Sequence, residues 1–399
     1  MAAQGRLGYM VPQFPGQTHA FFWREVKELE ARGVPVRLLS TRPPPPGLVA
    51  HAWSEEAAAR TLYLGRPAVA DALLALPALP WGELRAPEKG FLRDLAIALP
   101  AARRLGAVAR AEGLDHVHVH SCGRSALIAA LSRRMGGPSY SLTLHGPLSD
   151  YGPGQNLKWR GAEAATVITE RLLAEVRTVL RDDLPPRLVV QPMGVDTGRF
   201  RRDGPYLPRA TGPFRVVSCG RLNVVKGHQD LLLAVRLLRE GGLDASLTII
   251  GEDDAGGTGF RATLEAKVAE LGLNAHATLL GAVDEGRVRE ELLKAHAFAL
   301  ASWSEPLGVA LMEAMACGVP TVGTAAGGVR ELIRDGADGL LVPPRDPARL
   351  AAALRRIAED AGLARALSAG GRARVETAFH AGRGAEALVA LLGLRAHPG

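Results

Sequence analysis

Cysteine is scarce in this chain of 399 residues. Its three cysteines, Cys122, Cys219 and Cys317, are odd in number and far apart, which excludes a disulfide framework and a zinc ribbon. Long apolar runs are also lacking, because the longest candidate, 68–81, is interrupted by Asp and Pro and falls short of the roughly 18 residues that a membrane span needs. The N-terminus lacks the charged-then-apolar layout of a secretory signal. These absences predict a cytoplasmic globular protein.

Lysine is the second scarcity, since 42 of the 48 basic residues are arginine. Up to Tyr206 there are 26 Lys and Arg against 19 Asp and Glu, whereas after it the counts are 22 and 22. A basic N-terminal half suits anionic phosphates or the acidic inner face of a membrane. The alternative is an Arg-rich composition that reflects only a GC-rich genome. No basic helix or aromatic-studded sheet indicates nucleic acid as a partner.

Short apolar runs alternate with amphipathic helical stretches, a pattern that predicts α/β structure with parallel sheets. A polar, Pro-containing stretch at 201–212 separates two such halves, so we expect domains at 1–205 and 206–379. Residues 68–112 read as apolar helices with interspersed arginines, and 306–317 as a helix that Gly and Pro punctuate. The predicted strands are 7–11, 34–39, 116–120, 139–144, 165–168, 214–219, 246–250, 297–301 and 321–323. Two open α/β domains are expected to face a central cleft at the carboxyl ends of their strands, where ligands bind.

The segment Ser304–Pro320 carries the strongest chemical signal. It combines a strand end, an acidic residue and a helix start at Leu307, Gly308 and Val309, where backbone N–H groups suit phosphate oxygens. Glu305 and Glu313 lie eight residues apart, roughly 12 Å along a helix axis. That separation suits one carboxylate on a sugar and the other on a ribose, with a diphosphate between them. It excludes the close carboxylate pair of a glycosidase.

The pattern S-x-S-E-P-x-G-x-x-x-x-E-A-M-A-C-G-x-P resembles the large retaining glycosyltransferase family four. The resemblance implies the GT-B fold of two Rossmann-like domains, with a C-terminal helix at about 380–399 that packs back on the first domain. It implies that Glu305 binds the donor sugar, that Glu313 binds the ribose and that Leu307, Gly308 and Val309 lie at the diphosphate. The structural alternative is a pair of solvated glutamates on a helix surface.

A second match is the loop Gly220–Gly227, in which Arg221 and Lys226 precede a predicted helix. Two cations beside a helix N-terminus can neutralise a diphosphate leaving group. The family's G-R-x-x-x-x-K-G loop does this, so the resemblance assigns the leaving group to Arg221 and Lys226. The alternative is an idle pair of surface cations.

Further matches extend over most of the chain. They include G-V-D-x-x-x-F from Gly194 and G-G-x-x-E from Gly327. The opening from Phe14 resembles the exopolysaccharide and colanic-acid branch, and this makes Gly16 the glycine of the phosphate loop. The sequence departs from the family after 246–250, where Gly-Glu-Asp-Asp replaces G-x-G and adds negative charge.

The histidines invite a different interpretation. His116, His118 and His120 alternate with valines and share one face of a strand, as zinc ligands can. No acidic or Cys partner is spaced to complete such a site, so no metal is predicted. His118 and His120 are expected instead to be hydrogen-bonded structural residues near the cleft. His145, at a strand end, resembles the family's histidine that contacts the transferred sugar. The alternative for His145 is an ordinary core or loop histidine.

We therefore predict an EC 2.4 hexosyltransferase-type enzyme that needs no cofactor or metal beyond its nucleotide-diphosphate sugar co-substrate. Arg221, Lys226, Glu305 and His145 are the predicted catalytic residues, and a donor phosphate oxygen takes the proton of the acceptor hydroxyl. The branch resemblance implies a glycan or lipid-linked acceptor in surface polysaccharide synthesis, with peripheral contact at the inner membrane face. Two alternatives stay open: a nucleotide-sugar epimerase of the same fold, and a non-catalytic nucleotide-sugar-binding scaffold protein.

Overall fold

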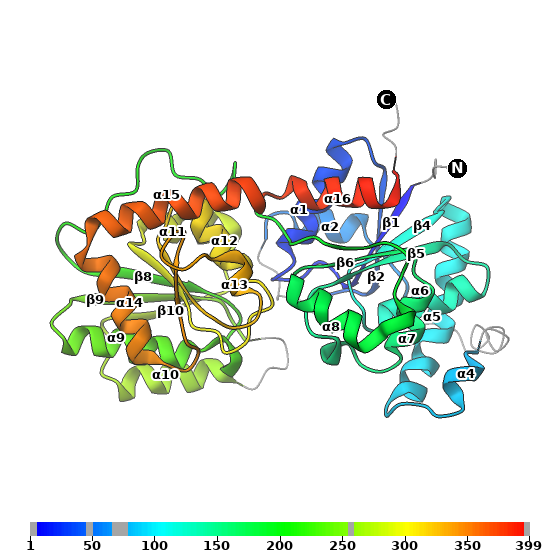
Figure 1. The fold of residues 1–399 in the computed structure, drawn as a ribbon, viewed down its shortest axis with the longest axis horizontal. Helices are drawn as coiled ribbons and strands as arrows, with labels where there is room; N and C mark the ends of the chain where they lie inside the picture. Colours follow the sequence, from blue (N-terminus) through cyan, green and yellow to red (C-terminus); the bar gives the residue numbers. More distant parts are fainter. Residues whose placement is uncertain (1–5, 45–50, 66–78, 254–258, 395–399) are drawn as a thin grey trace. The chain divides into compact units, whose positions relative to one another are not determined.

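The computed structural model describes residues 6–44, 51–65, 79–253 and 259–394, and it divides them into two compact units (Figure 1). The main part of the first unit ends at Pro192, and the chain returns to this unit from Gly382 onwards. The boundary thus lies before the predicted position at 205/206. The reason is that Val195 forms a parallel bridge with His380, which ties the start of the linker to the second unit.

The first unit is built on a seven-stranded sheet in the order β3-β2-β1-β4-β5-β6-β7, and every neighbouring pair in it is parallel. The sheet order reverses between β1 and β4, which makes this the topological switch point of a doubly wound sheet. The strands are β1 Leu7–Gln13, β2 Val36–Arg42, β3 Leu62–Tyr63, β4 His116–Val119, β5 Ser139–Leu144, β6 Ala164–Val167 and β7 Leu188–Val190.

Helices connect these strands, and the C-terminal helix α16 lies beside α1 (Figure 1). Leu388 of α16 and Val26 of α1 are both buried in the same apolar core. Of the predicted helical region 68–112, the part up to residue 78 lies outside the described residues. The helices are α1 Ala20–Ala31, α2 Ser54–Arg60, α4 Trp81–Leu84, α5 Phe91–Glu112, α6 Arg124–Arg134, α7 Gln155–Arg160, α8 Glu170–Leu180 and α16 Gly382–Leu392.

The second unit repeats the plan with a six-stranded parallel sheet in the order β10-β9-β8-β11-β12-β13. Its order reverses between β8 and β11, and α9 and α14 pack side by side on it (Figure 1). The elements are β8 Phe214–Cys219, α9 His228–Glu240, β9 Ala245–Ile250, α10 Phe260–Glu270, β10 Ala277–Gly281, α11 Glu285–Lys294, β11 Ala297–Leu300, α12 Val309–Ala316, β12 Thr321–Thr324, α13 Val329–Leu332, β13 Leu340–Val342, α14 Pro347–Glu359 and α15 Ala361–Ala378.

Local sequence signals explain several element boundaries. The side chains of Thr169, Asp284 and Asp346 accept hydrogen bonds from backbone N–H groups in the first turns of α8, α11 and α14. Pro347 then occupies the first helical position of α14, where its missing N–H costs nothing. The predicted α/β class with two Rossmann-like domains is confirmed.

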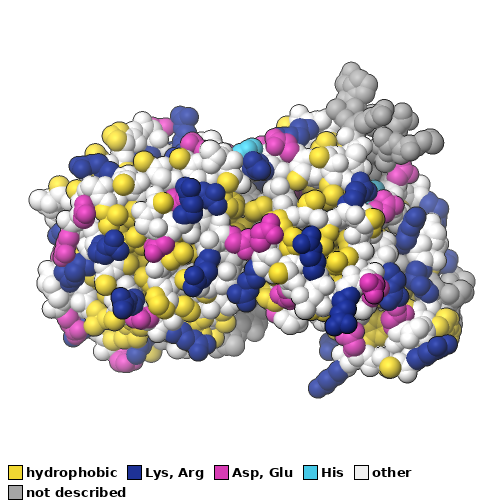
Figure 2. All heavy atoms as spheres, viewed as in Figure 1, with side chains coloured by type: hydrophobic (Ala, Val, Ile, Leu, Met, Phe, Trp, Pro, Cys, Tyr) yellow, Lys and Arg dark blue, Asp and Glu magenta, His cyan; other side chains and the backbone are white. Residues whose placement is uncertain are grey.

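Both signs of charge are spread over the face seen in Figure 2, with apolar side chains between them. Many charged side chains of the described residues are paired, as in the contact between Arg37 and Glu112 at 3.0 Å. None of the helices within the described residues is both long enough and apolar enough to cross a bilayer.

Candidate active site

Lys226 lies on the loop that follows β8, at the switch point of the second unit. Asn223 begins the short 3₁₀ turn 224–226, and its Oδ1 accepts the backbone N–H of Lys226 at 3.2 Å. Gly227 has a φ of 67°, and a Cβ atom there would lie 2.0 Å from the carbonyl oxygen of Ala301. A glycine is therefore required here, and it brings the lysine loop against the chain that leaves β11.

Glu305 follows β11, on the other side of the same switch point, and it pairs directly with Lys226. The Lys226 Nζ lies 2.6 Å from Glu305 Oε2, with side chains that are 19% and 8% exposed. The Ser302 hydroxyl donates to the same carboxylate oxygen at 3.0 Å. Two predicted site residues that are 79 positions apart thus form one contact. Ser302 is an additional residue that the sequence pattern contained without indicating its role.

The loop that follows β12 fixes the position of the Glu305 backbone. Gly328 donates its N–H to the Glu305 carbonyl oxygen at 3.0 Å. A Cβ atom at Gly327 would lie 2.0 Å from that same oxygen, and the φ of Gly327 is 62°. The two glycines of the G-G-x-x-E motif therefore hold Glu305 in place through their backbone atoms.

Helix α12 begins at Val309, which is later than the predicted start at residue 306. Gly308 has a φ of 100°, a left-handed conformation that cannot belong to an α-helix and that favours glycine. The helix is eight residues long, and its first turn begins four residues after Glu305. Leu307 is buried as a whole residue. The first N–H groups of a helix have no partner within it, and they suit phosphate oxygens.

Glu313 and Arg221 lie at the same end of this sheet. Burial raises the pKa of the Cys219 thiol at the end of β8 to about 12, and the nearby Glu313 carboxylate adds to this effect. Lys226 acts on the same thiol in the opposite direction, so both charges lie close to Cys219. The side chain of Arg221 is exposed, while its carbonyl oxygen contacts the His228 ring at 3.3 Å.

The departure from the family pattern after β9 is compensated locally. Glu252 forms an ion pair with Arg261 at 2.7 Å, and Asp253 accepts the backbone N–H of Arg261 at 3.2 Å. The backbone carbonyl of Glu252 also accepts the N–H of Leu222 at 3.1 Å. The added negative charge of Glu252 is therefore balanced by an arginine of α10.

In the first unit, the predicted histidines do not all have the same surroundings. Each ring nitrogen of His116 and His118 contacts a hydroxyl oxygen of β5, at distances between 2.7 and 2.8 Å. Ser141 is shared between the two rings, and Thr143 completes the contacts of His118. These contacts fit the structural role that the sequence left open for His118.

His120 and His145 form a second pair, at the switch point of the first unit. Their Nδ1 and Nε2 atoms are 3.2 Å apart, and His120 Nε2 lies 3.1 Å from the Glu25 carboxylate. Burial lowers the pKa of His120 to about 3. Burial, together with the neighbouring His120, lowers the pKa of His145 to about 3 as well. Both rings are therefore neutral at physiological pH. Glu25 has a contact here that no single-sequence signal revealed.

Gly16 lies in the turn after β1, at the same switch point. The backbone N–H of His19 donates to the Gly16 carbonyl at 3.0 Å. A Cβ atom at position 16 would lie 2.5 Å from the His19 ring, so the turn leaves no space for a side chain. This compact turn agrees with a loop in which the backbone itself meets a ligand.

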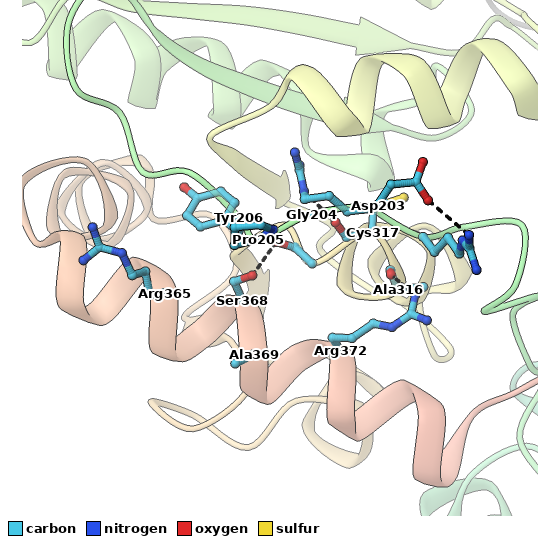
Figure 3. A pocket seen from close by; sticks show the side chains of 13 residues that line it. Asp203, Gly204, Pro205, Tyr206, Ala316, Cys317, Arg365, Ser368, Ala369 and Arg372 are labelled. Atoms are coloured by element: carbon cyan, nitrogen blue, oxygen red, sulfur yellow. Dashed lines mark hydrogen bonds and ion pairs between the residues drawn. The ribbon is translucent and has the colours of Figure 1, made fainter.

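A depression of about 650 Å³ also lies on the second unit, and none of the predicted site residues lines it (Figure 3). Its arginines bind the protein itself: Arg372 donates to the carbonyls of Thr197 and Phe200, and Arg201 pairs with Asp203 at 3.2 Å. The Ser368 hydroxyl donates to the Gly318 carbonyl at 2.6 Å. These contacts anchor α15 to the linker and to the end of α12, so this depression has a structural explanation.

Two sequence families match the chain in succession. Residues 20–199 match a family described as glycosyltransferase family 4, and residues 204–374 match one described as glycosyl transferases group 1. A D-inositol 3-phosphate glycosyltransferase of Geodermatophilus obscurus is 34% identical over 246 residues, which are 58% of this chain and 54% of that protein. An amylovoran biosynthesis glycosyltransferase of Erwinia amylovora is 32% identical over 203 residues, or 49% of this chain and 47% of that protein. The chain spans about half the length of these relatives.

Solved structures resemble the chain over almost its whole length. HepE of Anabaena, in a crystal structure with UDP, gives a TM-score of 0.74 at 17% identity and covers 97% of this chain and 99% of its own. Sucrose-phosphate synthase of Thermosynechococcus elongatus gives 0.73 at 21% identity, with 97% and 96% covered. At these identities the likeness shows the fold, and it agrees with the two parallel sheets described above.

Proposed function

We propose that this chain, in which residues 20–199 belong to glycosyltransferase family 4 and residues 204–374 to the group 1 glycosyl transferases, transfers a sugar from a nucleotide-diphosphate sugar with retention of the anomeric configuration. The observation that carries the proposal is the ion pair between Lys226 and Glu305 at the switch point of the second unit. Ligands of open α/β sheets bind at such points.

Each residue of the site has a role in this proposal. Lys226, Arg221 and the start of α12 stabilise the charge that develops on the departing diphosphate, because fixed donors aimed at developing charge lower the barrier. Glu305 accepts hydrogen bonds from hydroxyls of the transferred sugar, and Glu313 accepts those of the ribose. Lys226 changes partner from the carboxylate to the phosphate when the donor binds.

In the first unit, the proposal assigns roles to Gly16 and His145. Gly16 brings the backbone of its turn to the diphosphate or the acceptor, and neutral His145 contacts a sugar hydroxyl. No protein base is needed, because a donor phosphate oxygen takes the proton of the acceptor hydroxyl. With these cations in place we also propose that turnover needs no metal ion.

For the acceptor we propose a glycan or a lipid-linked sugar of a surface polysaccharide. The opening from Phe14 supports this proposal, as does the similarity to the amylovoran biosynthesis glycosyltransferase. HepE binds UDP, which makes UDP the first nucleotide to test.

Thermal unfolding with UDP, GDP, ADP and their common sugars, with and without EDTA, tests the donor site. A ligand at about 100 times its dissociation constant adds about 2.7 kcal/mol, which raises the melting temperature by roughly 5 °C. We expect a rise with one nucleotide that EDTA leaves unchanged. A Glu305→Gln variant that responds to the donor sugar as the wild type does would contradict the site.

Product analysis then separates the alternatives. With the donor that raises the melting temperature, transfer to a sugar or lipid-linked acceptor supports the proposal. Release of an epimerised sugar without an acceptor would replace it with the epimerase, and tight binding without any turnover would replace it with the scaffold protein.

A further inference from the structure

A buried chain of polar side chains in the first unit connects helix α1 with His145. It consists of Tyr9, Glu25, His120 and His145, and we call it the Glu25 chain. We propose that Glu25 is a positioning residue that acts through His120 to determine which ring nitrogen of His145 carries the hydrogen. The inference rests on the proposed function only where it assigns His145 a contact with a sugar hydroxyl. The tautomer of His145 can be measured without substrate.

The geometry of the chain begins at the carboxylate. The Tyr9 hydroxyl of β1 donates to Glu25 Oε2 at 2.7 Å. His120 Nε2 lies 3.1 Å from the same oxygen, although the contact does not have the geometry of a hydrogen bond. An ionised carboxylate oxygen this close repels a nitrogen lone pair and attracts an N–H group. A buried donor is also costly to leave unpaired, so we expect the hydrogen of His120 to be on Nε2, facing Glu25.

The carboxylate itself is confined on its other side. Helix α16 passes so close that a Cβ atom at Gly384 would lie 2.4 Å from Glu25 Oε1. The side chain of Glu25 is 18% exposed and that of His120 is 3% exposed. The glycine therefore makes room for the carboxylate and fixes its position between α16, β1 and the end of β4.

In the Glu25 chain, the direction of each hydrogen bond determines the direction of the next. An ionised carboxylate can only accept, so His120 carries its hydrogen on Nε2 and presents the lone pair of Nδ1. The contact at 3.2 Å with His145 Nε2 then requires the hydrogen of His145 to be on Nε2. In this tautomer the lone pair of His145 lies on Nδ1, the atom that would accept a hydrogen bond from a sugar hydroxyl under the proposed function. A protonated Glu25 can donate instead, and this reverses both tautomers.

The surrounding groups bear on the protonation of Glu25. Burial raises the pKa of Glu25, while the Tyr9 hydrogen bond, His118 and His145 oppose that rise. His118 is occupied by two β5 hydroxyls, and His19 acts on His145 electrostatically. Since both His120 and His145 stay neutral over the physiological range, only their tautomers can change, and Glu25 is the group that sets them.

The test reads the tautomer directly in the full chain labelled with ¹⁵N-histidine. Two-bond ¹H–¹⁵N spectra distinguish the two neutral tautomers, and His145→Gln assigns the signals. We expect the Nε2–H form for His120 and His145 near neutral pH. We expect Glu25→Gln to produce the Nδ1–H form of His145 or a mixture, and Glu25→Asp to retain the wild-type form.

The matched control is Glu28→Gln, one turn along the same helix, where Glu28 pairs with Arg32 at the surface. It is expected to leave both tautomers unchanged. An Nδ1–H form of His145 in the wild type, or an unchanged spectrum in Glu25→Gln, would overturn the inference. Neither result depends on turnover, so a failure here is distinct from a failure of the proposed transferase.

Tyr9→Phe keeps the inference testable if Glu25→Gln does not fold. It removes the hydrogen bond that lowers the pKa of Glu25, so the pH at which the His145 tautomer reverses should move upward. If turnover uses the Nδ1 lone pair, the acid limb of the kcat profile moves upward with it, while Glu28→Gln has the wild-type profile. A tautomer change at the wild-type pH in Tyr9→Phe would contradict the role of Glu25.

Discussion

At the scale of single residues, the most informative contact is the one between Lys226 and Glu305. Removing one partner of a buried ion pair leaves the other charge uncompensated, so alanine variants combine a loss of stability with a loss of chemistry. Glu305→Gln and Lys226→Met remove the same charge, but they open no large cavity. They keep the side-chain volume, and the amide oxygen introduced by Glu305→Gln would still accept a hydrogen bond from Ser302.

We expect Glu305→Gln and Lys226→Met each to lower kcat about 10²- to 10³-fold, because each removes an interaction that the proposed transition state uses. Lys267 and Glu270 offer a matched control, since they form an exposed pair on α10 with a contact of 2.7 Å. Lys267→Met and Glu270→Gln should cost less than about 1 kcal/mol of stability and leave kcat unchanged. Steady-state kinetics with the donor identified by thermal unfolding measures kcat for the site variants and the control variants. Full turnover in either site variant would refute the assignment.

At the scale of elements, the loop between β12 and α13 positions Glu305 through Gly327 and Gly328. Gly327→Ala would place a Cβ atom 2.0 Å from the Glu305 carbonyl oxygen. The backbone of Glu305 must then move, and a displacement of about 1 Å in a catalytic group can reduce a rate about 100-fold. We expect Gly327→Ala to lower kcat at least tenfold.

The matched control for this loop is Gly336→Ala. Gly336 has a φ of 76°, close to the 62° of Gly327, but a Cβ atom there meets no heavy atom within 4 Å. Gly336→Ala should lose about 1–2 kcal/mol through backbone strain alone, and Gly327→Ala should lose more because of the added clash, as measured by urea unfolding. Only Gly327→Ala should lose turnover. Equal kcat values in the two variants would show that this loop does not position Glu305.

The elements also show how far the sequence predicts the site. Motif spacing was sufficient to predict the strands that precede Lys226 and Glu305, because both strands are short apolar runs with clear boundaries. The roles of the two residues stay predictions. Motif spacing was insufficient for the start of α12, where the left-handed Gly308 delays the helix to Val309. It also missed the Tyr9–Glu25 contact between β1 and α1, because the way in which a helix packs beside a strand depends on tertiary structure rather than on local pattern.

At the scale of the whole molecule, the two units repeat one arrangement with different chemistry. Each sheet reverses its order once, and each reversal carries the predicted site residues of its unit. The second unit places a lysine–glutamate pair there, whereas the first places neutral histidines. We therefore propose that these histidines recognise hydroxyls rather than charge, as an acceptor or sugar subsite requires.

Acid should destabilise the whole molecule through its buried histidines. Burial lowers the pKa of His120 and His145 to about 3 and that of His116 and His228 to about 4, so the native state excludes protons that the unfolded chain binds near pH 6.5. The contribution of these neutral histidines to the free energy of unfolding is therefore fully present above about pH 6.5. It decreases as the pH falls toward 4, by about 1.4 kcal/mol per pH unit for each histidine. The raised pKa of Glu25 acts in the opposite direction but belongs to a single group. Urea unfolding at about pH 7, 6 and 5 measures the slope. In the Trp303→Phe variant all remaining tryptophans lie in the first unit, so their fluorescence follows the unfolding of that unit. The first unit also holds three of these four histidines. An unfolding transition that is independent of pH would contradict the burial of these histidines as neutral rings.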